Sequence, residues 1–292
     1  MSALLAGFAL WLGLACQGCY YPGDDWAGYE RAALRLGKMR LERRPADLPV
    51  SRQALADNFR RIAFGIETDV LAHDDPMAST GGVLRRWRRP VRWAVTSFGP
   101  EAGAHRAAVE AMTRRLATAT GHAIAPAVED AGEAANLAVM FLRPEDYAPI
   151  AARLAARPGG GWLAHQLDRF GRAGHTPCVG IFLHARDASA GEPDEILYAL
   201  ALIRAGLPER LARACVEEEL AQAMGLPNDD ADVRPSVFND DQEFALLTAH
   251  DEALLAILYD ARLRPGMSEA EAMALVPAIV AGLDARGFSG RR

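Results

Sequence analysis

The sequence predicts an α/β fold of the α+β type, because stretches with strand periodicity and stretches with helix periodicity follow one another along the chain. Residues 89–98 alternate apolar and polar side chains, which is typical of a strand with one covered face. Residues 136–142 and 178–183 are apolar runs of strand length. Residues 104–120 repeat apolar side chains at helical spacing and end at Gly121, a common helix stop. A mixed sheet covered by helices accounts for this order.

The composition is that of a globular domain with an acidic balance. The 292 residues include 38 acidic and 32 basic side chains, and half of the residues are apolar. Lys38 is the only lysine. This charge balance gives no indication of a nucleic-acid partner.

The N-terminus predicts an export leader over residues 1–19. Residues 1–15 are apolar and uncharged, a length typical of a signal-peptide core and short for a membrane span. Cys16 and Cys19 follow, each after a small residue, so each is a candidate for lipid attachment. We therefore expect an exported protein of a Gram-negative bacterium, either periplasmic or attached to a membrane as a lipoprotein. The alternative is an N-terminal helix that is buried in the fold.

The next residues, 20–82, are predicted to form a tether and a helical preface. A short helical stretch covers residues 29–40. Apolar residues at helical spacing follow Ser51, which is well placed to cap that helix. Residues 73–82 carry turn signals, and we expect the main domain to occupy residues 83–265.

Within that domain, residues 144–172 are predicted to be helical with a break at 158–161, and residues 196–203 are a further candidate strand. A capping box at Ser268 opens a C-terminal helix to about Leu283, within a final segment 266–292.

Four arginines surround Trp87 at residues 85–89. Such a cluster could bind anionic lipid or a polyanion. The simpler interpretation is a solvated edge at the entrance of a strand.

The helix predicted over residues 208–225 carries the chemistry. Pro208 suits a helix start, and Gly225 suits its end. Glu218 and Gln222 are four residues apart and therefore project from one face. Asn228 follows the glycine and can return toward that face.

This pattern resembles the zinc site of the metzincins, in which two helical histidines, a glutamate, a glycine turn and a third histidine follow in order. The resemblance places Glu219 at the catalytic glutamate and Gly225 at the turn glycine. No ligand position holds a histidine, and the corresponding residues are Glu218, Gln222 and Asn228.

The resemblance continues over about fifty residues, 208–259. Asp229 matches the residue after the third ligand, and Ser236 and Phe238 lie where the Met-turn would be, without its methionine. Thr248 is expected to cap a closing helix. The same combination resembles an uncharacterised proteobacterial family of unknown function that includes many members regarded as lipoproteins. The resemblance implies a metzincin-like sheet with an active-site-type helix and a C-terminal helical subdomain.

The ligand positions do not suit zinc, which prefers imidazole or thiolate. Their oxygen atoms suit calcium or magnesium better, provided that acidic residues of the following loop contribute. Glu218 and Glu219 could also act as acid and base without a metal. Alternatively, Glu218, Gln222 and Asn228 form a hydrogen-bonded cluster that fastens the helix to residues 236–238. We expect no cofactor.

Cys178 and Cys215 are the two cysteines outside the leader, and they could pair or remain as buried thiols. Export favours a disulfide, which would tie the helix to the sheet and stabilise the domain by roughly 3 kcal/mol. His250 is expected at the surface.

The sequence therefore predicts a non-catalytic, metzincin-like exported domain that binds a protein or peptide in its cleft or serves the structure of the cell envelope. The alternative is a hydrolase that uses a hard metal ion or the carboxylates of Glu218 and Glu219. Membrane contact is expected only through the N-terminal anchor or an uncleaved leader.

Overall fold

The computed structural model describes residues 25–65, 82–128, 134–157, 160–174, 176–185, 190–239 and 241–284. The predicted leader with Cys16 and Cys19 lies outside these residues, as does most of the predicted loop before residue 82.

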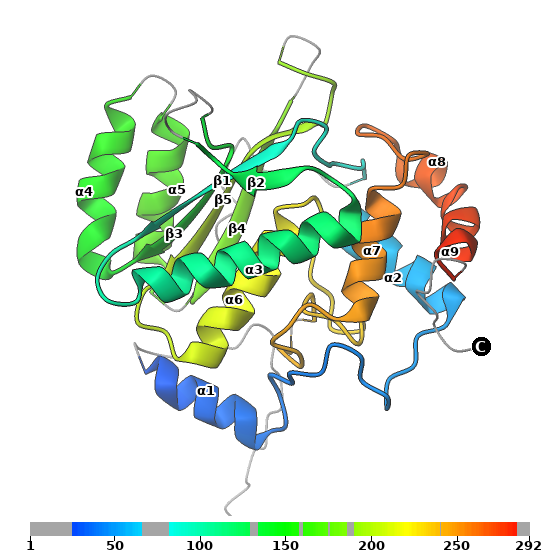
Figure 1. The fold of residues 1–292 in the computed structure, drawn as a ribbon, viewed down its shortest axis with the longest axis horizontal. Helices are drawn as coiled ribbons and strands as arrows, with labels where there is room; N and C mark the ends of the chain where they lie inside the picture. Colours follow the sequence, from blue (N-terminus) through cyan, green and yellow to red (C-terminus); the bar gives the residue numbers. More distant parts are fainter. Residues whose placement is uncertain are drawn as a thin grey trace, which may run out of the picture.

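The described residues form nine helices and one five-stranded sheet, which confirms the predicted α/β class (Figure 1). The helices are α1 (Trp26–Arg35), α2 (Arg52–Phe64), α3 (Ala102–Thr120), α4 (Pro144–Ala155), α5 (Gly161–Arg172), α6 (Glu209–Gln222), α7 (Ala249–Leu258), α8 (Glu269–Met273) and α9 (Val276–Asp284). The strands are β1 (Val91–Ser97), β2 (Ile124–Pro126), β3 (Leu137–Leu142), β4 (Cys178–His184) and β5 (Ile196–Arg204).

The sheet is mixed, with the strand order β2-β1-β3-β5-β4. The first four strands in this order are parallel, and β4 runs antiparallel to β5 at one edge. The predicted strands at 89–98, 136–142, 178–183 and 196–203 are all present. Strand β2, which has three residues and ends in proline, was not predicted.

Helices cover both faces of the sheet. All six residues of β3 are buried, because alternate side chains enter two different cores. Leu137, Val139 and Phe141 belong to the larger core, together with residues of α2, α3, α6, α7 and α9. Leu142 and its two alternate neighbours face α4 and α5 in a smaller core. Figure 1 shows these two helices on one side of the sheet and α3 and α6 on the other.

Local signals set most helix boundaries as predicted. The hydroxyl oxygen of Ser51 accepts from the backbone N–H of Ala54 at 3.1 Å and begins α2. Gly121 ends α3 with φ 67°. The C-terminal helix predicted after Ser268 is instead two helices, α8 and α9. Pro277 lies in the first turn of α9, where proline favours a new helix start.

No helix in the described part of the chain is both long enough and apolar enough to cross a membrane.

Candidate functional site

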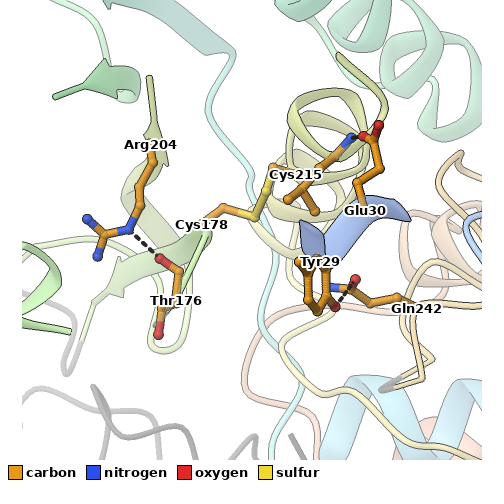
Figure 2. The surroundings of a disulfide bond; sticks show 8 residues. Tyr29, Glu30, Thr176, Cys178, Arg204, Cys215 and Gln242 are labelled. Atoms are coloured by element: carbon orange, nitrogen blue, oxygen red, sulfur yellow. Dashed lines mark hydrogen bonds between the residues drawn. A yellow bond between two sulfur atoms is a disulfide. The ribbon is translucent and has the colours of Figure 1, made fainter. Parts of the chain in front are cut away.

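The predicted metzincin-type helix is α6, and it lies beneath the sheet with most of its side chains buried. Helix α1 packs against the N-terminal end of α6. The carboxylate of Glu30 accepts from the backbone N–H of Leu211 at 2.9 Å, so a negative charge lies where the helix dipole favours one. Tyr29 of α1 donates to Gln242 beside it (Figure 2).

A disulfide joins the middle of α6 to the edge strand β4, as the sequence predicted. Cys178 and Cys215 are bonded, with their Cα atoms 5.8 Å apart (Figure 2). This bond fixes the helix against the strand that is least supported by the sheet, because β4 has only β5 as a neighbour among the described strands.

Glu219 lies four residues after the bonded cysteine and packs against β4. It exposes 5% of its surface. Gly180 is its neighbour on the strand, and a Cβ atom on residue 180 would lie 2.8 Å from Oε2 of Glu219 and 3.1 Å from its backbone oxygen. From Cys215 to Glu219 the helix rises about 6 Å, and from Cys178 to Gly180 the strand rises about 6.6 Å. The contact between Gly180 and Glu219 therefore lies one step along from the disulfide. The strand therefore needs glycine where the carboxylate lies.

Glu217, the first of the three consecutive glutamates, has a structural role. Its carboxylate accepts from both terminal nitrogens of Arg43, at 2.9 and 2.6 Å, and from the backbone N–H of Leu247 at 2.9 Å. Because Glu217 is buried, this ion pair holds the segment before α2 and the segment before α7 on the same helix. Glu218 is half-buried.

Gln222 and Asn228 both donate hydrogen bonds within the protein. The amide nitrogen of Gln222 donates to Oδ1 of Asp229 at 3.0 Å. The amide nitrogen of Asn228 donates to the backbone oxygen of Arg61 at 3.0 Å, at the end of α2. Gly65 leaves room for it, since a Cβ there would lie 2.3 Å from that nitrogen. The segment after α6 is thus fastened to α2 and to itself.

Gly225 was predicted to end the helix; α6 instead ends at Gln222, and Gly225 lies in the turn that follows. Its φ of 109° suits glycine, and a Cβ atom would lie 2.2 Å from the backbone oxygen of Arg85. Two side chains donate to carbonyls of this turn. The indole of Trp87 donates to Ala223 at 2.8 Å, and the hydroxyl of Tyr259 donates to Met224 at 2.9 Å.

Ser236 and Phe238, which were expected at a Met-turn position, lie in a segment that α7 holds in place, and the backbone N–H of Phe238 donates to the hydroxyl of Ser236 at 3.0 Å. The hydroxyl of Ser236 donates to Oδ1 of Asp251 at 2.5 Å, and the backbone N–H of Val237 donates to Oδ2 at 3.1 Å. Thr248 caps α7 and donates to the same carboxylate. Both Ser236 and Asp251 have no exposed surface. This role of Asp251 was not predicted, although its position three residues after a threonine cap is the signal of a capping box.

His250 was predicted at the surface, and this was wrong. Its side chain exposes 2%, and its Nε2 lies 3.0 Å from the amide nitrogen of Asn58 on α2. The first turn of α7 packs against α2, a contact between distant parts of the chain that a residue's place in its own helix does not reveal.

Acidic residues near the motif, considered above as additional metal ligands, form ion pairs. Arg61 binds Asp230 at 2.8 Å, and Lys38 binds Asp241 at 3.4 Å. Asp240 lies outside the described residues. Over the described ranges, no three histidine, cysteine, aspartate or glutamate side chains come together in a way that could hold a metal ion.

The arginines around Trp87 contact other segments of the fold and do not form a solvated edge throughout, as Arg85, Arg86 and Arg89 show. Arg85 exposes only 4% of its side chain, and its Nε lies 3.2 Å from Asp194. Arg89 pairs with Glu195 at 3.4 Å. Arg86 donates to the backbone oxygen of Leu258 at 2.7 Å. Through these contacts, the arginines hold the segment before β1 against the segment before β5 and against the end of α7.

The sequence matches the family described as Protein of unknown function (DUF2927) over residues 52–278. The chain belongs to this family. The DUF2927 region includes α2 to α8, the whole sheet and the motif on α6, whereas α1 precedes it. No curated protein and no solved structure matches the chain.

Proposed function

We propose that this DUF2927 protein is an exported, membrane-attached domain of metzincin-like type that acts in binding or in envelope structure and not in catalysis. The order of its parts supports the metzincin-like assignment. A mixed sheet precedes α6, a glycine turn follows, and the chain then passes through residues 236–238 into the closing helix α7.

The observation that carries the non-catalytic assignment is the use of the two amides at ligand positions. Gln222 is bonded to Asp229, and Asn228 is bonded to the end of α2. Each amide nitrogen is used as a donor, so each side chain is held by a partner in the protein, and its carbonyl oxygen is the atom that remains as an acceptor. Hydrogen bonds inside the protein thus do in this domain the positioning that a metal ion does in a zinc site.

The edge strand β4 supports a peptide partner. Among the described strands only β5 pairs with it, so one row of backbone N–H and C=O groups faces away from the sheet. An extended peptide can add to such an edge through main-chain hydrogen bonds. The disulfide to α6 would keep this edge rigid during binding.

Peptide hydrolysis tests the proposal. The purified protein should not cleave a mixed peptide library above the background of the Glu219→Gln variant. A Glu110→Gln variant on the exposed face of α3 controls for a co-purifying peptidase. Cleavage that persists in Glu110→Gln and disappears in Glu219→Gln would show catalysis.

Metal analysis tests the alternative hydrolase. Stoichiometric calcium or magnesium after dialysis, lost in Glu218→Ala, would support a hard-metal enzyme in place of the binding function. For the membrane attachment, labelling of cells with a fatty-acid analogue should mark the protein, and Cys16→Ala and Cys19→Ala tested separately would identify the modified residue.

A further inference from the structure

Three exposed leucines lie within eight residues of one another in the sequence, at the end of α1 and in the segment that follows it. Leu34, Leu36 and Leu41 expose 38%, 74% and 42% of their surfaces. The other exposed large apolar side chains of the described chain, Phe98 and Val128, belong to distant segments. Single exposed apolar residues are ordinary, but several within eight residues of sequence indicate a contact surface. We call these three residues the leucine patch.

Helix α1 presents basic side chains beside this patch. Trp26, Tyr29 and Ala33 are its buried face and pack against α6 and its surroundings. Arg31 and Arg35 are four residues apart and exposed, so they share the opposite face. Figure 1 shows α1 at the margin of the molecule, with α6 between it and the sheet. The outward face of α1 is therefore open to a large, flat partner.

The segment that carries the patch has a charge opposite in sign to that of the whole chain, and three of its basic residues, Lys38, Arg40 and Arg43, pair with acidic residues of other segments. Residues 25–53 carry an excess of three positive charges, whereas the chain has a net charge of -6. The basic residues are Arg31, Arg35, Lys38, Arg40, Arg43, Arg44 and Arg52, and the acidic residues are Asp25, Glu30, Glu42 and Asp47. Arg31 and Arg35 remain exposed on α1, where they can contact an anionic surface.

The position of the patch in the chain favours a membrane as the partner surface, because the patch lies close to the proposed lipid anchor. This closeness rests on the proposed lipid attachment. Cys19 lies only six residues before Asp25, the first described residue. Six extended residues span about 20 Å at most. An anchor at Cys16 or Cys19 would thus hold α1 near the bilayer surface.

We propose that the leucine patch and the arginines of α1 rest on an anionic phospholipid surface. The leucines would enter the headgroup region, and the arginines would contact lipid phosphates, as in helices that lie in the plane of a membrane.

Hydrogen exchange of the full-length protein reconstituted in lipid nanodiscs tests this proposal. Amides of residues 31–44 should exchange about tenfold more slowly in phosphatidylglycerol discs than in phosphatidylcholine discs, since each basic residue near an anionic surface adds about fivefold in affinity. High salt should reduce the difference. The double variant Leu36→Glu with Leu41→Glu should abolish it, while Phe98→Glu, a matched change of an exposed residue elsewhere, should preserve it.

Four outcomes would overturn the proposal. Equal exchange of residues 31–44 in both kinds of disc would exclude an anionic lipid surface. Protection that also occurs in detergent and depends on protein concentration would assign the patch to a second copy, and concentration-independent protection in detergent would assign it to residues 1–24. A protein that fails to float with vesicles would exclude both this contact and the membrane attachment, whereas the peptide assay tests the binding function separately.

Discussion

Gly180 of β4 and Glu219 of α6 are in such close contact that the strand has no room for a side chain at position 180. The nearest atoms to a Cβ there would be Oε2 of Glu219 at 2.8 Å and its backbone oxygen at 3.1 Å. The carboxylate can move, but the backbone oxygen belongs to a helix that a disulfide holds in place.

We therefore expect Gly180→Val to destabilise the protein by about 2 kcal/mol, the usual cost of forcing extra atoms into a packed contact. Urea denaturation with the disulfide intact measures it. Gly103→Ala is the matched control, because nothing lies within 4 Å of its Cβ position in α3. That variant should gain up to about 1 kcal/mol from helix propensity. Unchanged stability of Gly180→Val would mean that β4 and α6 separate easily.

Removing the disulfide should cost more than any single contact on α6. The two cysteines are 37 residues apart, and closing a loop of that length restricts the unfolded chain by about 4 kcal/mol. We expect Cys215→Ser to lower the free energy of unfolding by about this amount. Thiol titration of the denatured wild type provides the check on pairing, and two reactive thiols from residues 178 and 215 would contradict the bond.

Asp251 should be the most sensitive carboxylate of the closing segment. It accepts from Ser236, Val237 and Thr248 and has no exposed surface. Asparagine at this position would turn an N–H toward donors, so Asp251→Asn should cost about 3 kcal/mol. Asp25→Asn, at the exposed cap of α1, should cost less than about 1 kcal/mol. Equal effects of the two variants would show that the buried network is dispensable.

Arg204 is buried under the helical pair α4 and α5, and its guanidinium donates to backbone oxygens of Thr176, Phe170 and Ala173 at 2.7, 3.1 and 2.7 Å. Methionine would fill much of its volume but leave these oxygens unbonded. Arg204→Met should therefore destabilise the protein by about 3 kcal/mol. The increase in the rate of hydrogen exchange should be greatest in α5. Arg204→Lys should recover part of the loss, and exchange that rises equally in α3 would instead indicate global unfolding.

His105 should contribute to acid sensitivity. Burial lowers its pKa below the ordinary 6.5, and the charge of Glu101 only partly opposes this. The unfolded chain then binds a proton more readily than the folded protein, so stability falls as pH drops from about 7 through the unfolded value toward the folded one. His105→Phe retains an aromatic ring against Phe141 and should flatten this decline in denaturation midpoints. His165 is exposed, so the control variant His165→Phe should leave the decrease in stability at low pH unchanged.

Much of the fold follows from local patterns, because strand alternation and helix caps are encoded within a few residues. Gly121, Ser51 and Thr248 each begin or end a helix as predicted. The short strand β2 could not be predicted, because three residues are too few to show a periodic pattern. The break between α8 and α9 had a signal in Pro277 that the continuous apolar pattern outweighed.

The candidate site was harder to predict, since its contacts join segments that are distant in sequence. The bonded cysteines followed from the expected compartment, but the partners of Asn228 and His250 belong to α2, more than 150 residues earlier. Spacing along one helix shows which side chains share a face. It does not show what lies opposite that face.

The position of α1 has a practical consequence for defining this domain. The family match begins at residue 52, yet Glu30 accepts from the start of α6, and Trp26 and Tyr29 share a core cluster with Leu211. A chain truncated at the family boundary would expose that apolar surface to water and leave a buried helix end without its acceptor. Its low solubility would reflect a missing piece of the fold and would say nothing about the family itself.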